Sequence, residues 1–195
     1  LAVSNGFLNI CEDDFCKEIV LLIFPQLKNI DILKKLKKNY KIEIAKKDFI
    51  FLLSLLIIDD TDNAEFFLYK FNISNQAKAK INFLQEVHDK SYDKDTFSKK
   101  NLQKIFYFQG KSYLLDAIDF QLFRLNKKNN KLIELKKHFE KLEKPNFPIK
   151  AKILMEKYNL KEGKEFGQKL KHLENLWVEN NFNISEEEVE NTFLG

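Results

Sequence analysis

Glycine and proline are scarce in this chain: five glycines and three prolines occur among its 195 residues. Because these two residues mark most tight turns and hairpin loops, few such turns can be built. Apolar residues also recur at intervals of three and four, which is the spacing of one face of an α-helix. Together these features predict an all-α fold class, with a multi-helix body followed by a small helical tail.

Length and composition narrow the choice further. A chain of 195 residues can form one large domain or two small ones, and 44% hydrophobic with 32% charged residues is a soluble globular composition. The longest apolar run, residues 49–58 interrupted by Ser54, is too short to span a bilayer. It predicts a buried core helix, and no membrane partner is expected.

The apolar spacing places helices along the whole body. The predicted segments are residues 15–24, 31–40, 48–58, 62–71, a helix capped by Ser74, a helix that begins at Asp95 or Thr96, 113–125 and 131–143. Asp31 is expected to cap its helix, because its side chain can accept a bond from a free first-turn amide. Gly110 is the expected left-handed stop between two helices. Phe66 and Leu125 are among the side chains expected to face the core.

A short extended connector at residues 144–148, which contains two prolines, is the predicted internal boundary. It divides the chain into a helical body (1–143), a helical tail with a glycine-marked helix start (144–182) and an acidic C-terminal segment (183–195). Residues 174–195 contain six Glu and no Lys, which fits a solvated tail.

Charge is distributed unevenly around the net value of +4: residues 127–171 contain 14 Lys and six Glu. This block fits a surface that faces a polyanion, and it also fits helices that simply carry lysine on their solvated sides. The basic residues are 32 lysines and the single Arg124. Lysine meets phosphate as a point charge and lacks the planar fork of arginine, so base-specific reading by arginine is disfavoured.

The tail has its own pattern of small, basic and apolar residues. Gly163 and Gly167 lie at the predicted start of a helix that runs to residue 180, where free amides and the helix dipole favour a phosphate. Lys164 and Lys171 share one helix face, opposite an apolar stripe that is expected to be buried and to include Trp177. The alternative is structural: Gly163 ends a turn, and Gly167 permits close helix packing.

The same stretch resembles the carboxyl-terminal end of bacterial tRNA nucleotidyltransferases, the CCA-adding and poly(A) polymerase family, particularly its alphaproteobacterial branch. The residues that fit the family pattern are Pro148, Ile149, Leu154, Gly163, Phe166, Gly167, Leu170 and Trp177. Ala151, Ile153 and Lys164 stand where the family usually has glycine, aspartate and proline. A weaker likeness extends through the body, at residues 107–124 and 17–36.

The resemblance implies a module that binds tRNA or other RNA through shape and phosphates. It would position tRNA for 3′-end nucleotide addition by a head domain that this chain lacks, joined covalently or supplied in trans as a separate polypeptide. The candidate RNA-binding residues are Lys150, Lys152, Gly163, Lys164, Gly167 and Lys171. The alternative is a helical protein-interaction module, or a degenerate remnant with no role in RNA binding.

No catalytic or metal-binding residue is predicted in this chain, and whether it acts as an enzyme is left open. Asp60-Thr61-Asp62 spells the Asp-x-Asp of the resembled family but follows an apolar helix without the required strand and glycine turn, so a helix stop and cap is expected. Magnesium would belong to the absent head domain. His88, His138 and His172 show no zinc spacing and are expected at the surface.

Two cysteines, Cys11 and Cys16, are too few for a disulfide framework and are expected to be reduced in a cytoplasmic protein. Residues 1–10 lack the basic start and long apolar centre of a signal peptide. A first residue of leucine, Leu1, indicates an expression fragment, a processed product or a natural fragment.

Overall fold

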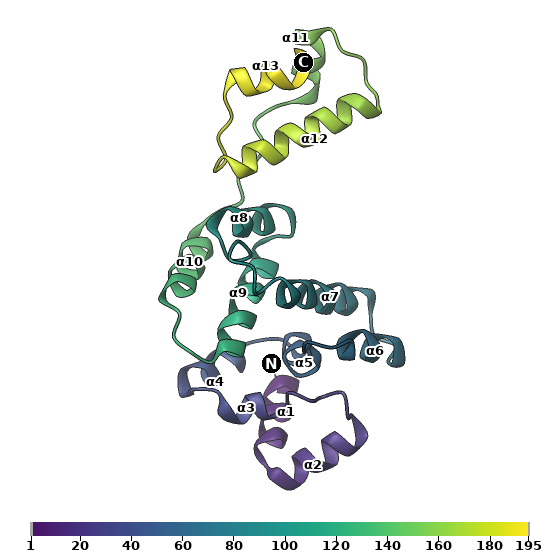
Figure 1. Ribbon diagram of the computed structural model, residues 1–195, viewed down its shortest axis with the longest axis vertical. Helices are drawn as coiled ribbons and strands as arrows, with labels where there is room; N and C mark the ends of the chain where they lie inside the picture. Colours follow the sequence, from purple (N-terminus) through teal and green to yellow (C-terminus); the bar gives the residue numbers. More distant parts are fainter. Residues whose placement is uncertain (1, 195) are drawn as a thin grey trace.

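A computed structural model describes residues 2–194 and shows 13 α-helices and no strand in that range, which confirms the all-α fold class (Figure 1). The first seven helices are α1 (Ala2–Glu12), α2 (Asp14–Ile23), α3 (Asp31–Lys35), α4 (Lys38–Ile44), α5 (Phe49–Ile57), α6 (Asn63–Lys70) and α7 (Asn75–Asp89). They are followed by α8 (Lys99–Phe108), α9 (Lys111–Leu125), α10 (Asn130–Lys141), α11 (Ala151–Tyr158), α12 (Lys164–Glu179) and α13 (Glu186–Leu194).

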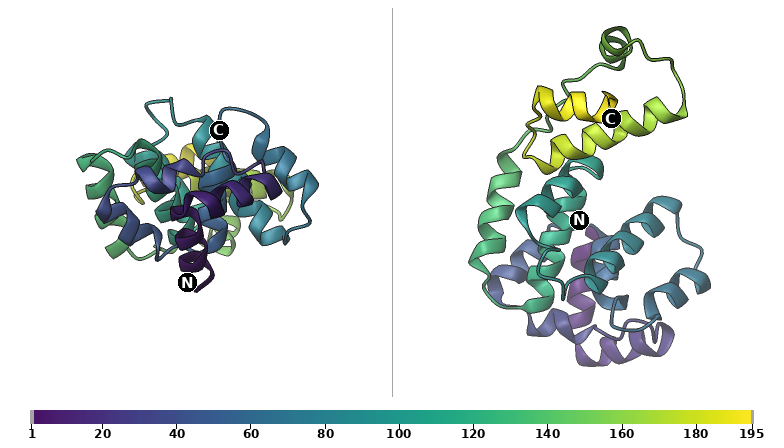
Figure 2. Two further views of the ribbon diagram at one scale, coloured as in Figure 1. Left: turned by 90° about the horizontal axis from the view of Figure 1, so that it is seen from below. Right: turned by 45° about the horizontal axis from the view of Figure 1, so that its top comes forward.

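The helices form an elongated molecule. Figure 1 shows α1–α7 at one end, α8–α10 in the middle and α11–α13 at the other end. In the right-hand view of Figure 2, α11–α13 form a layer of their own beyond α8 and α10. The non-helical segment 142–150 is the covalent link between the two parts.

Helix α5 is the centre of the main core, as its continuous apolar sequence predicts. Every residue from Phe51 to Ile57 is buried, and α5 packs against α1, α6, α7 and α9. The ring of Phe51 meets Phe120 and Phe123 of α9 edge-on, with centroids 6.4 and 5.8 Å away. Such edge-to-face contacts stabilise a core beyond the area that they bury.

Local capping residues set several helix boundaries. Ser74 accepts a hydrogen bond from the amide of Ala77 and caps α7, as predicted, while Asp48 caps α5 through the amide of Phe51. The predicted start of α8 is wrong by a few residues, because Ser98, rather than Asp95 or Thr96, provides the cap.

The expected helix over residues 31–40 is split, and its expected cap is wrong. Asp31 is the first residue of α3, and its carboxylate accepts from the Lys17 ammonium at 3.0 Å instead of capping an amide. The chain is extended at Leu36 and at Lys37 before α4 begins. Leu36 is buried in the main core, and the Asn126 side chain accepts a hydrogen bond from the Lys37 amide, so tertiary contacts fix the break.

One helix was not expected from the sequence, and two side chains expected in the core are exposed. Helix α1 has no counterpart among the predicted segments. Leu125 and Phe66 are 42% and 52% exposed rather than inward, because α9 ends at Leu125 and because α6 turns Ala64 and Phe67 towards the core. Gly110 does adopt a positive φ of 97°, as a left-handed stop requires, and begins α9.

Two buried carboxylates on α9 are enclosed by lysines from three other parts of the body. Asp119 is 2% exposed and receives Lys47 and Lys136, each at 2.6 Å. Asp116 receives Lys47 at 2.8 Å and Lys80 at 2.7 Å. Burial alone would lower the pKa of Lys47, but the carboxylates of Asp119 and Asp116 outweigh it and raise that pKa. We call these five residues the α9 ion cluster.

The tail has a small core of its own, formed by α11, α12 and α13. Phe193 of α13 is buried and stacks on Tyr158 at 5.7 Å between ring centroids, while Phe166 of α12 lies equally close. Ser185 caps α13 through the amide of Glu188, whose carboxylate accepts from Ser185 in return. The acidic C-terminal segment is therefore not a solvated tail: its glutamates lie on a helix whose apolar side packs against α11 and α12.

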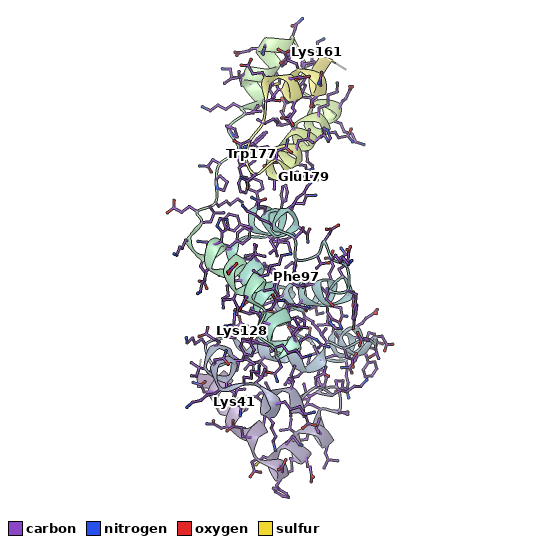
Figure 3. All side chains as sticks on the ribbon, turned by 60° about the vertical axis from the view of Figure 1, so that its left-hand side comes forward. Lys41, Phe97, Lys128, Lys161, Trp177 and Glu179 are labelled. Atoms are coloured by element: carbon purple, nitrogen blue, oxygen red, sulfur yellow. The ribbon has the colours of Figure 1, made fainter. Side chains whose placement is uncertain are left out.

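Helix α12 also holds the tail on the body, through α8. Trp177, which is 3% exposed, meets the Tyr107 ring at 5.3 Å between centroids. Figure 3 shows Trp177 and Glu179 at the narrow junction between tail and body. Tyr107 donates to the Glu174 carboxylate at 2.6 Å, and burial followed by this contact raises the pKa of Tyr107 to about 12. Trp177 is thus a core residue, as its place on the apolar stripe predicts.

Replacing Leu52 in α5 tests the importance of the main core. We expect Leu52→Ala to lower the free energy of unfolding by about 2–5 kcal/mol, because the fully buried side chain leaves a cavity. Leu22→Ala is the matched control: Leu22 is 82% exposed, so its shift should stay within about 0.5 kcal/mol. Chemical denaturation measures both, and equal midpoints would contradict a central role for α5.

The junction between tail and body should depend on pH through Glu179. Hydrogen bonds from Lys104 and Lys100 lower its pKa from 4.5 to about 2. Because the folded-state pKa is the lower one, this stabilisation is complete above about pH 4.5 and is lost as the pH falls towards 2. We expect the fluorescence of Trp177 to change over this range, and Glu179→Gln to remove much of that change. Identical pH profiles for parent and variant would refute the assignment.

Candidate functional site

The first turn of α12 leaves backbone amides free. Gly163 occupies the N-cap position and provides no side-chain hydrogen bond. Within residues 2–194, no protein group accepts from the amides of Lys164, Glu165 or Phe166. Side chains cap α2, α5, α7, α8, α10 and α13, whereas α3, α4, α6, α9 and α11 share with α12 the absence of a side-chain cap. Uncapped first-turn amides carry the positive end of the helix dipole and can bind an anion.

The two glycines at this turn are open to the surroundings. A Cβ atom placed on Gly163 or on Gly167 would meet no atom within 4 Å. The structural alternative for Gly167, close helix packing, is therefore wrong. Gly163 has a φ of 174°, an extended conformation that any residue adopts, so its backbone does not require glycine either. Neither packing nor conformation explains the two glycines, and both leave room for a close approach to the backbone.

Lysines stand on the same side of α12 as Gly167. Lys164 and Lys171 are seven residues apart, which places them on one helix face, and both are exposed. Within the described part of the chain, neither forms an ion pair. The opposite face is buried, with Phe166, Leu173 and Trp177 in the cores described above. The helix thus presents one apolar and one basic side, as its sequence predicts.

Lys150 and Lys152 form a second group. They are exposed and lie at the start of α11, whereas the loop to Gly163 leaves the other end of that helix. Eight residues of helix separate these ends, about 12 Å at 1.5 Å per residue. The six candidate RNA-binding residues therefore divide into a pair on α11 and four residues along α12.

The Asp-x-Asp sequence is a turn between α5 and α6. The expected cap is wrong, because the Asp62 side chain forms no capping bond at the start of α6. The Asp60 carboxylate accepts a hydrogen bond from Nε2 of His88 at 3.1 Å. His88 is 4% exposed, so its expected surface position is wrong, whereas His138 and His172 are exposed. Burial, reinforced by the nearby Arg124 charge, lowers the pKa of His88. The packing of α7 against α5 and α9 draws this histidine inward.

Arg124 is also part of the body rather than of a binding surface. Its guanidinium donates to the Ile58 carbonyl at 2.7 Å and lies 5.7 Å from the centre of the Phe120 ring. The only arginine is thereby used to join α9 to the end of α5. Base reading by an arginine fork is not available from this residue in its observed position.

Metal binding finds no support in the donor groups present. Between residues 2 and 194, no three His, Cys, Asp or Glu side chains come together as a group that could hold a metal ion. Asp60 and Asp62 lie in a turn, so these residues do not fit the two-metal centre of the resembled family.

Cys11 and Cys16 are free thiols, and burial raises the pKa of Cys11 to about 11. No helix in the described range is both long and apolar enough to cross a membrane.

No protein-family model, curated protein or solved structure matches this chain. The resemblance to tRNA nucleotidyltransferases therefore stays a prediction from the sequence.

Sequence reasoning missed a group of lysines that the fold assembles from distant segments. Lys37 and Lys38 lie close to Lys127 and Lys128, because Tyr40 donates to the Lys127 carbonyl at 3.0 Å. The repeated lysines in both segments are visible in the sequence, but about 90 residues separate them. Only a contact between the segments, which periodicity does not reveal, could have joined them.

Gly167 offers a test of the open surface on α12. We expect Gly167→Ala to raise the free energy of unfolding by about 0.5–1 kcal/mol, because alanine favours the helix and its Cβ meets nothing. Gly110→Ala is the control: the φ of 97° strains any other residue there, so this change should destabilise the protein. Thermal unfolding measures both. Destabilisation by Gly167→Ala would show a close contact at this site.

Proposed function

We propose that this chain is an RNA-binding helical module, similar in role to the body and tail of a tRNA nucleotidyltransferase of the CCA-adding or poly(A) polymerase type. One observation carries the proposal: free first-turn amides, two open glycines and two unpaired lysines share one exposed face of α12. Each of these features favours a phosphate, and together they occupy about two turns of one helix.

The binding chemistry follows from these groups. The amides of the first turn can donate to phosphate oxygens, while Lys164 and Lys171 add positive charge along the same face. Gly163 and Gly167 place no side chain between the helix and a sugar–phosphate backbone. Contacts of this kind fix the position of a duplex without reading its bases, which suits recognition of RNA by shape.

In this proposal the chain binds tRNA or other RNA in the cytoplasm and does not itself transfer nucleotides. A head domain, covalently joined or in trans, would supply the magnesium site and the reaction, and the module would position the RNA 3′ end. The free cysteines fit a reducing compartment. Magnesium-dependent addition of CTP or ATP to a tRNA by this chain alone would contradict this division of labour.

A second candidate function is a protein-interaction module, and the surface of α2 favours it. No residue of α2 is buried, and Phe15, Leu22 and Ile23 are 71%, 82% and 59% exposed. Large apolar side chains grouped on one helix often mark a protein contact. This surface lies at the opposite end of the molecule from α12 (Figure 1), so one chain can hold both functions.

The double variant Lys164→Ala/Lys171→Ala tests RNA binding by the tail. We expect several-fold weaker binding to tRNA at moderate salt. The slope of the logarithm of the binding constant against the logarithm of the salt concentration should fall by the equivalent of about one to two phosphate contacts. The free energy of unfolding should stay within about 0.5 kcal/mol of the parent, because both side chains are exposed and unpaired. Fluorescence anisotropy over a series of salt concentrations measures the binding.

The control is Lys94→Ala/Lys99→Ala, which removes the same charge from exposed lysines far along the chain. Gly167→Glu, which adds bulk and negative charge, should weaken binding more than Gly167→Ala does. If the tail variants bind tRNA as tightly as the control, α12 is a packing element, and the protein-interaction function becomes the better explanation.

A further inference from the structure

Asn126 joins two lysine-rich segments of the body. It ends α9 in a left-handed conformation, with φ 45° and ψ 28°, which asparagine tolerates better than most residues. Its amide nitrogen donates to the Lys35 carbonyl at 2.7 Å, and its amide oxygen accepts from the Lys37 backbone at 3.2 Å. The Tyr40 hydroxyl adds a bond to the Lys127 carbonyl. The junction of α3 and α4 is therefore held against the start of the α9–α10 loop.

This junction gathers exposed ammonium groups. Six lysines belong to it, all exposed and none in an ion pair within residues 2–194: Lys35, Lys37, Lys38, Lys127, Lys128 and Lys131. We call them the Asn126 patch. Figure 3 shows Lys41 and Lys128 on the same flank of the body.

Two carboxylates on neighbouring helices are paired with lysines outside the Asn126 patch, and Glu134, three residues after Lys131 on α10, is the acidic side chain next to the patch that forms no ion pair within residues 2–194. Asp14 pairs with Lys34, and Glu12 pairs with Lys41 at 3.0 Å. The backbone hydrogen bonds of Asn126 and Tyr40 hold the two lysine segments together despite their mutual repulsion. A bound polyanion would remove that repulsion, and its counterions would be released.

We propose that the Asn126 patch is a second phosphate-contacting surface, which binds the backbone of an RNA duplex whose other end lies on α12. The identity of the polyanion as RNA rests on the proposed function. Lysine alone, without an arginine, supplies point charges that track a backbone and read no bases. The patch thus extends the proposed RNA binding from the tail to the α3–α4 junction of the body.

The two surfaces lie in different parts of the molecule, so only a sufficiently long RNA can contact both. Helix α10 lies between the Asn126 patch and the tail in Figure 1, and its 12 residues alone span about 18 Å. Glu134 and Glu140 alternate with the lysines of α10, so the charge there is mixed and the two surfaces stay separate. A duplex of about 16 base pairs, the span of a double-stranded-RNA-binding domain, is the probe for simultaneous contact with both surfaces. A duplex of about six base pairs should contact one surface at a time.

The test compares two variants with the same change in charge. The patch variant replaces Lys37, Lys38, Lys127 and Lys128 with Ala. The control replaces Lys70 of α6, Lys78 of α7, Lys94 in the loop before α8 and Lys99 of α8; these helices lie apart from α3 and α4 in Figure 1. The hydrogen bonds to residues 37 and 127 use backbone atoms, so alanine preserves them. Circular dichroism confirms that both variants fold.

Binding of a 16-base-pair RNA duplex is measured for both variants and for Lys164→Ala/Lys171→Ala across a series of salt concentrations. We expect the patch variant to bind about tenfold more weakly than the control and to reduce the salt slope by up to about three phosphate contacts. The loss should be smaller for a duplex of about six base pairs, because simultaneous contact at two surfaces no longer contributes.

Each outcome separates this inference from the proposed function. Equal binding by patch variant and control, with a loss for the tail variant, overturns the Asn126 patch and leaves the tail site standing. A loss for the patch variant alone supports the patch and overturns the tail site. Absence of RNA binding by the parent chain overturns both. Vesicles rich in phosphatidylserine are the second probe: if the patch variant loses vesicle binding but keeps RNA binding, the surface is for membranes and the inference is wrong.

Discussion

The body depends on the ion pairs that lysines form with two buried carboxylates of α9. Asp116 and Asp119 lie among the helices of the main core, where an unpaired charge would be strongly destabilising. Lys47, Lys80 and Lys136 approach them from the α4–α5 loop, α7 and α10, so the three surrounding segments are tied to one helix. Removing a single partner from such a buried pair typically costs about 3–5 kcal/mol. Through the pair of Lys136 with Asp119, the α9 ion cluster holds α10 against α9, and α10 leads to the tail.

The same cluster separates structural lysines from those that can bind a ligand. Lys136 of α10 is committed to Asp119, whereas Lys127 and Lys128, just before α10, have no acidic partner in the described chain. A lysine held by a buried carboxylate cannot release counterions to a phosphate, but an exposed and unpaired one can. The basic character of residues 127–171 is therefore not uniform. The fold divides it into internal pairs, a patch around Asn126 and the face of α12.

The position of the tail depends on α12, which packs in the tail core and also against the body. One end of its apolar face enters the tail core through Phe166, and the other end meets the body through Trp177 and Tyr107. Ion pairs of Glu179 with Lys100 and Lys104 flank this second contact. Because one helix spans both cores, its basic face has a fixed direction relative to the body. The proposed contact of one RNA duplex with two surfaces requires such a fixed relation.

Features set by neighbours in sequence could be predicted, and features set by distant neighbours could not. Periodicity and local caps located α5 and α7 and the opposed apolar and basic faces of α12, because those interactions link residues three or four apart. The break after Leu36, the burial of His88 and the return of Phe193 to the tail core come from partners about 30 to 90 residues away. The sequence determined where most of the helices lie and where lysine is abundant. Tertiary structure decided which lysines stay free, since pairing depends on the carboxylates that folding brings near.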